Sequence, residues 1–173
     1  MITAMVKEKS GVGVEFRLLK ECPEVIPTLV GWIYEHWLPY DPSLTEERLV
    51  EGFRERLHDD RLPLTIVAFR EGDPVGVISL KTEEAPELNE IAEGSPWLGS
   101  LHVIESFRGV GIGSQLLHLS GAVAAKLGYR HIFLYTSDPD NVSWYKKQGA
   151  VVIGQQICRK RPVWVFRLDF AHE

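Results

Sequence analysis

Residues 108–114 read Arg-Gly-Val-Gly-Ile-Gly-Ser and are the most informative segment of the chain. An apolar segment at 97–104 has the pattern of a strand and precedes them. Apolar residues at helical spacing follow, at Ile112, Leu116, Leu119, Val123 and Leu127. Glycines between a strand and a helix let the backbone approach an anion, and free N–H groups at the helix start point toward it. The segment therefore predicts a site for a phosphate-containing cofactor.

The spacing of these glycines excludes two common phosphate-binding loops. A dinucleotide-binding Gly-x-Gly-x-x-Gly pattern fails because its third glycine would fall on Ser114 or Leu116. A P-loop is absent because the chain contains no Gly-Lys pair. The pattern that fits is Arg-x-x-Gly-x-Gly, which runs from Arg108 through Gly111 to Gly113.

On this pattern the sequence resembles the GNAT superfamily of acyl-CoA-dependent N-acetyltransferases, whose pyrophosphate loop is (Arg/Gln)-x-x-Gly-x-(Gly/Ala). The flanking residues agree with the resemblance: Leu101-x-Val103 before the arginine, Leu116-Leu117 after it, and Tyr-Lys-Lys-Gln-Gly-Ala at 145–150. The resemblance covers residues 60–170 well and the first 60 residues only by their general layout. The alternative is a glycine-rich turn that binds no ligand.

Length, charge and cysteine content are those of a small globular enzyme. With 173 residues, 45% of them hydrophobic, the chain is expected to form one domain over residues 1–173. The net charge of −5 argues against nucleic acid as a partner, because a polyanion binds a basic face. No apolar run approaches the ~18 residues that span a bilayer, and the first ten residues lack a signal-peptide core, so no membrane partner is expected. Cys22 and Cys158 form no CxxC site or disulfide framework, and the expected compartment is the cytoplasm.

The periodicity of apolar residues predicts an α/β fold with one mixed sheet flanked by helices. Strands are expected at 14–20, 64–70, 75–80, 97–104, 131–136, 151–157 and 163–169. Helices are expected at 24–37, from a capping box at Ser43-x-x-Glu46 to about Leu57, at 112–127 and at 138–149. The order is β-α-α-β-β-β-α-β-α-β-β, which is also the GNAT-like layout that the resemblance implies. The resemblance further implies that the fourth and fifth strands splay apart and expose a main-chain edge.

The resemblance implies acetyl-CoA as cosubstrate, without a metal, and a set of residues that bind it. The pantetheine arm would run beside Leu101, His102 and Val103, and the amides of Gly109, Val110, Gly111, Ile112, Gly113 and Ser114 would take the pyrophosphate. Arg108 would offer its guanidinium to a phosphate, or alternatively form a surface ion pair. Asn141 would contact the pantetheine arm, or alternatively cap the helix that follows.

Tyr145 is the candidate catalytic acid, because it falls where the family places a tyrosine near the departing thiolate. A phenol of pKa about 10 stays protonated at neutral pH and donates a hydrogen bond. The alternative, compatible role is packing beside Trp144. For the base, the resemblance implies a glutamate near the start of the fourth strand, which here is Glu93 or Glu90. His102 is the other candidate, since an imidazole has a suitable pKa, unless it is simply packed on its strand.

The acceptor is expected to be an amine of a small molecule or peptide. Residues 82–93 carry five glutamates and no basic residue, which would attract a cationic amine, or else form a solvated loop. Four aromatic residues in or just after the first helix either wall the acceptor or pack in the core: Trp32, Tyr34, Trp37 and Tyr40. The basic turn at 159–161 would keep a hairpin soluble, rather than contact the 3′-phosphate of the cofactor.

The function implied is N-acetyl transfer from acetyl-CoA to a primary amine by direct attack in a ternary complex. The alternative is a non-catalytic domain that binds or senses acyl-CoA. The resemblance also allows a homodimer.

Overall fold

The computed structural model describes residues 1–11, 13–94 and 96–170. Five α-helices surround one seven-stranded sheet in this part of the chain. The helices are α1 (Ile2–Glu8), α2 (Ile26–Trp37), α3 (Glu46–Arg54), α4 (Ile112–Lys126) and α5 (Pro139–Lys147). The strands are β1 (Glu15–Leu18), β2 (Leu64–Arg70), β3 (Asp73–Lys81), β4 (Trp97–Val103), β5 (His131–Thr136), β6 (Val151–Cys158) and β7 (Arg161–Asp169).

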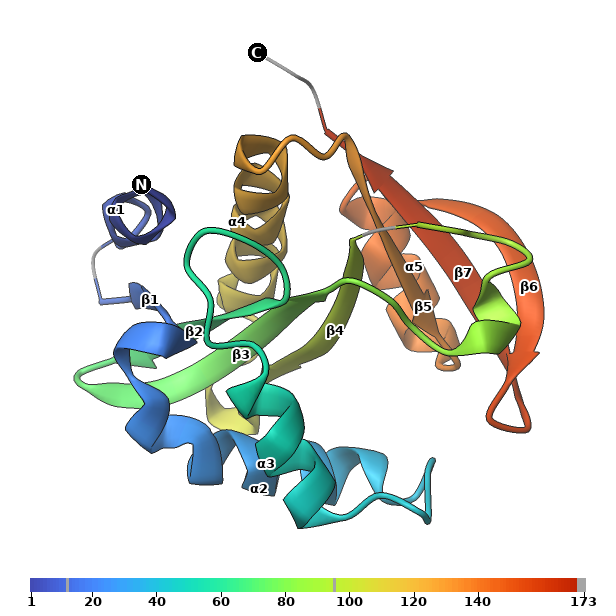
Figure 1. Cartoon of the computed structure of the whole chain (residues 1–173), viewed down its shortest axis with the longest axis horizontal. Coiled ribbons are helices and arrows are strands. Elements are labelled where there is room, and N and C mark those ends of the chain that lie inside the picture. Colours follow the sequence, from blue (N-terminus) through green and yellow to red (C-terminus); the bar gives the residue numbers. More distant parts are fainter. Residues whose placement is uncertain (12, 95, 171–173) are drawn as a thin grey trace.

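The sheet has the order β1-β2-β3-β4-β5-β7-β6 and is antiparallel except between β4 and β5. Helices α1, α4 and α5 lie on one face, and α2 and α3 cover the other face of the first four strands (Figure 1). Alternation along β2 explains the two layers, because Ile66 packs toward α4 while Val67 and Phe69 pack toward α2. The predicted α/β class and GNAT-like layout are confirmed.

The fourth and fifth strands pair only where they start. One register pair, Trp97 with Phe133, joins them, supported by the Phe133 N–H, which donates to the Pro96 carbonyl at 3.0 Å. Beyond Trp97, β4 pairs with β3 alone, and β5 pairs with β7 on its other side. The edge of β4 from Ser100 to Val103 therefore faces the opening between the strands, as expected.

A bulge turns the end of β4. The register between β3 and β4 shifts between Val77 and Ser79, which pair with His102 and Gly99. Ser100 adopts a left-handed backbone with φ 54°, which is typical of a bulge residue. As a result His102 shares the α2 side of the sheet with Val77, while Leu101 and Val103 pack with the core under α4.

The structure differs from the expected elements in two places. Helix α1 was not expected, because its seven residues are too few to be stable alone; burial of Ile2 and Val6 stabilises it. Helix α3 begins after Thr45, whose hydroxyl accepts from the Arg48 N–H at 3.2 Å. Ser43 is not the cap, because its hydroxyl donates to Asp41 at 2.6 Å.

Candidate active site

The glycine-rich turn leads from β4 into α4 through a short 3-10 turn at Glu105–Phe107. Gly109 and Gly111 have φ of 81° and 92°, the left-handed region that side chains other than glycine's disfavour. Gly111 is the N-cap of α4, and no side chain of the described residues caps this helix. The first amides of α4 therefore remain free to donate to an anion, with the positive end of the helix dipole behind them.

Arg108 ties the turn to the strand that precedes it. Its Nε donates to the Val103 carbonyl at 2.7 Å, and its side chain is otherwise exposed. One end of the guanidinium thus fixes the turn, and its remaining N–H groups are directed outward. Arg108 forms no ion pair within the described ranges, so the alternative of a surface salt bridge is wrong.

A cavity of about 480 Å³ lies between the end of β4, the turn and α5. Its lining contains every residue expected to bind the cofactor except Val110, together with Tyr145. Those residues are Leu101, His102, Val103, Arg108, Gly109, Gly111, Ile112, Gly113, Ser114 and Asn141. Val110 points away from the protein with 62% of its surface exposed, but its main chain still belongs to the turn.

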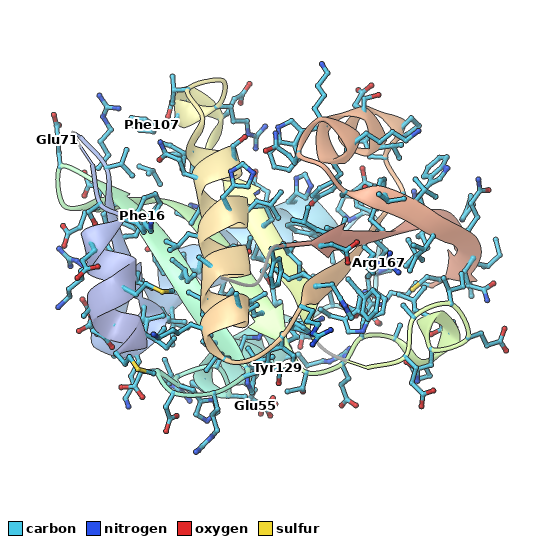
Figure 2. The ribbon with its side chains drawn as sticks, turned by 90° about the horizontal axis from the view of Figure 1, so that it is seen from above. Phe16, Glu55, Glu71, Phe107, Tyr129 and Arg167 are labelled. Carbon is cyan, nitrogen blue, oxygen red and sulfur yellow. The ribbon has the colours of Figure 1, made fainter. Side chains whose placement is uncertain are left out.

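Two further residues, Phe107 and Trp144, line the cavity and were not expected from the sequence. Figure 2 shows Phe107 at the N-terminal end of α4, with Tyr129 beyond the opposite end. A Cβ on Gly113 would lie 3.5 Å from the Trp144 ring, so the final glycine of the motif admits close packing of α5. Its position next to Tyr145 could have predicted that Trp144 lines the cavity. No feature of the local sequence predicts the same for Phe107.

Tyr145 combines burial with access to the cavity. Only 8% of its surface is exposed, and its ring packs on Trp144 and Phe166 at centroid distances of 5.0 and 5.7 Å. Burial raises the pKa of its phenol to about 12. The hydroxyl therefore stays protonated at neutral pH and can only donate or accept a hydrogen bond there. Packing and the acid role are compatible in this position.

Asn141 lines the cavity from the first turn of α5. The alternative that it caps this helix is wrong, because Asp138 is the cap and its carboxylate accepts from the Asp140 N–H at 2.9 Å. The amide of Asn141 is thus left available toward the cavity.

His102 joins the cavity to a group of aromatic rings on α2. Its ring centroid lies 5.8 Å from that of Trp32, 5.5 Å from that of His36 and 6.4 Å from that of Trp37. Burial, with smaller effects of His36 and Arg108, lowers the pKa of His102 to about 4. Burial likewise lowers the pKa of His36. Both imidazoles are therefore neutral at physiological pH.

The two candidate bases differ in position. His102 lines the cavity, whereas Glu93 is exposed in the connection before β4 and is not among the lining residues. Glu90 is exposed in the same connection. Glu84 is the carboxylate of this loop that turns inward, where Lys81 donates to it.

The basic turn between β6 and β7 does more than keep a hairpin soluble. Arg159 donates to the Tyr135 hydroxyl at 3.1 Å, and the Arg161 guanidinium lies 4.6 Å from the ring centroid of Tyr40. Arg161 also donates to the Pro39 carbonyl at 3.5 Å. The turn thus contacts the segment after α2, which lies on the same side of the sheet (Figure 1).

The expected core packing of Trp32 and Trp37 is confirmed, while their role as a wall for the acceptor stays a prediction. They pack against the core between α2 and the sheet, and each also contacts the His102 ring. Tyr40 is 39% exposed and forms the outer end of this row of rings.

No helix in the described ranges is both long and apolar enough to cross a membrane. The same residues contain no group of three or more His, Cys, Asp and Glu side chains arranged to hold a metal ion.

Comparison with known proteins adds the family. Residues 29–150 match the model of the acetyltransferase (GNAT) family. An N-acetyltransferase from Staphylococcus aureus Mu50 is 18% identical with a TM-score of 0.68, covering 90% of this chain and 98% of that one. A GNAT acetyltransferase from Streptococcus pneumoniae is 20% identical with a TM-score of 0.67, covering 91% and 99%.

A third similar structure contains the cosubstrate. It is a candidate streptothricin acetyltransferase from Bacillus anthracis str. Ames in complex with acetyl coenzyme A, 18% identical with a TM-score of 0.57, covering 69% of this chain and 68% of that one. At these identities the structures show a shared fold. No curated protein matches the sequence significantly. The family model spans well over half of the chain, and the chain therefore belongs to the GNAT family of acetyltransferases.

Proposed function

We propose that this protein transfers an acetyl group from acetyl-CoA to a primary amine of a small molecule or peptide, by direct attack in a ternary complex. The observation that carries the proposal is a single cavity that contains the glycine-rich turn, the free edge of β4 and Tyr145. Family membership supports the same chemistry.

The main chain supplies the binding site for the cosubstrate. The uncapped amides at the start of α4 bind the diphosphate, and the left-handed Gly109 and Gly111 leave open space where a Cβ would otherwise project. The main-chain groups of Leu101–Val103 that face away from β3 pair with the pantetheine amides as a further strand would, apart from the Val103 carbonyl, which already accepts from Arg108. Acetyl-CoA supplies an acyl group activated as a thioester.

Tyr145 assists the departing sulfur. As the N–C bond forms and the C–S bond breaks, negative charge collects on the sulfur, which the phenol stabilises by donating a hydrogen bond. Because its pKa is about 12, Tyr145 is a weaker acid than a thiol, whose pKa is about 8.5 in cysteine. The hydroxyl therefore acts chiefly as a hydrogen-bond donor, and the thiolate takes its proton from solvent.

The amine must lose a proton for the reaction to balance. With a pKa of about 4, His102 is too weak a base to deprotonate an alkylammonium ion before attack. The neutral fraction of the amine is therefore the nucleophile, and the burial that lowers the pKa of His102 and His36 also disfavours a charged ammonium group beside them. The proton released after attack passes to solvent, directly or through His102.

A thiol-release assay tests the proposal. The protein is incubated with acetyl-CoA and a panel of amino acids, peptides, polyamines and aminoglycosides, and binding of acetyl-CoA is measured in parallel by calorimetry. We expect binding together with thiol release for at least one class of amine. Binding without release across the panel would instead favour a non-catalytic acyl-CoA-binding domain, and absence of binding would exclude both functions.

A further inference from the structure

We propose that the acceptor carries an oxyanion, such as a carboxylate, in addition to the amine that is acetylated. Three basic side chains, Arg56, Lys81 and Arg159, would bind it; we call them the basic cluster. The inference rests on the proposed acetyl transfer and names the class of its acceptor.

The basic cluster lies where β4 leaves β5, on the sheet face opposite α4. Lys81 ends β3, and its side chain lies over β4, since a Cβ built on Gly99 would be 3.1 Å from the Lys81 Cδ. Arg56, just after α3, donates to Ser79 at 3.1 Å and to Ser100 at 3.3 Å. Ser100 is the bulge residue next to Leu101, which lines the cavity.

The third member reaches this region from the far half of the sheet. Arg159 follows β6 and donates to the hydroxyl of Tyr135 on β5. Its guanidinium lies 3.9 Å from a carboxylate oxygen of Glu84, whose other oxygen accepts from Lys81. Both sides of the opening between β4 and β5 thus contribute a cation to the same carboxylate.

The basic cluster holds more cations than carboxylates that form ion pairs with it. Glu84 has only 7% of its side chain exposed and is paired by Lys81 and Arg159, and it also interacts electrostatically with Arg56. Among the described residues, Glu84 is therefore the only carboxylate that forms ion pairs with the basic cluster, which carries three cations in a chain whose net charge is −5. Asp41 acts electrostatically on Arg159, and the exposed Glu55 on Arg56, but neither carboxylate forms an ion pair with the basic cluster in the described ranges.

Arg56 is the member of the basic cluster that most clearly lacks a carboxylate partner. Its hydrogen bonds go to two hydroxyls, and no carboxylate in the described part of the chain forms an ion pair with it. Burial lowers the pKa of this guanidinium. Arg56 is half-buried, and arginines withdrawn from water are normally paired. The planar guanidinium binds carboxylate or phosphonate oxygens in pairs. An oxyanion on the acceptor would complete this arrangement.

The charge of the preceding loop does not oppose this view. Glu83, Glu87, Glu90 and Glu93 are exposed, whereas Glu84 alone of the five turns toward the cations. On this proposal an amino acid fits the site better than a polyamine, and the attraction of a cationic amine by the loop stays a prediction.

Matched pairs of acceptors test the proposal. Each L-amino acid is compared with its carboxamide, and 2-aminoethylphosphonate with ethanolamine, by thiol release and by calorimetry on protein saturated with free coenzyme A. We expect the anionic member to be favoured by about tenfold or more in both measurements, as for a charge-assisted hydrogen bond. Equal or reversed preference in the wild-type protein would overturn the proposal.

Substitutions in the basic cluster test whether these side chains cause the preference for anionic acceptors. Arg56→Gln and Arg159→Gln should each lose roughly 10- to 100-fold in affinity for the anionic member, and change little for the amide and for acetyl-CoA. Lys160→Gln removes the exposed neighbour of Arg159 and should keep the preference. An equal loss of affinity for the anionic acceptor in Lys160→Gln would contradict specific binding by the basic cluster. Failure of thiol release with every acceptor would reject the acetyl transfer, while calorimetry would still decide whether the basic cluster binds oxyanions.

Discussion

At the scale of single residues, Tyr145 connects packing with chemistry. Its ring packs in the core, and the residue belongs to the lining of the cavity. Tyr145→Phe keeps the ring and removes only the donor. We expect kcat to fall by roughly 100-fold, as for loss of one hydrogen-bond donor to the charge that develops in the transition state, with acetyl-CoA affinity nearly unchanged. Steady-state thiol release and calorimetry measure the two quantities, and an unchanged kcat with a rate-limiting chemical step would exclude the role.

His102 makes a prediction about stability. In the unfolded chain its imidazole binds a proton as the pH falls through 6.5, whereas in the fold its pKa is about 4. Between these values the unfolded state binds more protons, so the free energy of unfolding falls as the pH is lowered. His102→Gln should therefore flatten the decline in urea midpoint between pH 6.5 and 4.

The matched control for this prediction is His118→Gln, at an exposed position of α4. It should leave the pH dependence as in the wild-type protein. An equal flattening in both variants would show that burial at His102 is not the cause.

At the scale of elements, we expect a glycine-to-alanine substitution to have opposite effects in the glycine-rich turn and in helix α2. Gly111→Ala places a Cβ on a residue with φ 92°, which costs about 1–2 kcal/mol and displaces the amides that begin α4. Affinity for acetyl-CoA should fall by roughly tenfold, about 1.4 kcal/mol.

Gly31→Ala serves as its control, because Gly31 lies within α2 and a Cβ there meets no atom within 4 Å. It should raise the free energy of unfolding by about 0.5–1 kcal/mol and leave acetyl-CoA binding unchanged. Chemical denaturation and calorimetry distinguish the two variants. Equal effects of both on binding would mean that the turn geometry is not what binds the diphosphate.

At the scale of the whole molecule, the cavity lies between the two halves of a sheet that are joined by a single β4–β5 register pair. A ligand bound there contacts both halves and is lost on unfolding. Acetyl-CoA at about 100 times its Kd should stabilise the protein by about 2.7 kcal/mol, which raises Tm by several degrees. Differential scanning fluorimetry measures the shift, which Gly111→Ala should reduce at equal ligand concentration. No shift at saturation would contradict binding in this cavity.

Much of the layout follows from local patterns in the sequence. Period-two and helical spacing predicted all seven strands and four of the five helices, and the Arg-x-x-Gly-x-Gly pattern predicted the turn before α4. These features depend on contacts between near neighbours, so a linear sequence contains them. Helix α1 was missed because it is stabilised by the sheet core against which Ile2 and Val6 pack, and not by its own residues.

The amino-acid sequence by itself determined the family, the strand-turn-helix that faces the cavity and the presence of a tyrosine at its wall. Only the tertiary structure decided which charged and polar side chains contact one another. Arg56 and Ser100 are 44 residues apart, Arg159 and Tyr135 are 24 apart, and Glu84 turns inward while its neighbours stay exposed. The reason is physical: a side chain's partners and burial depend on segments distant along the chain, which only packing of the sheet brings together.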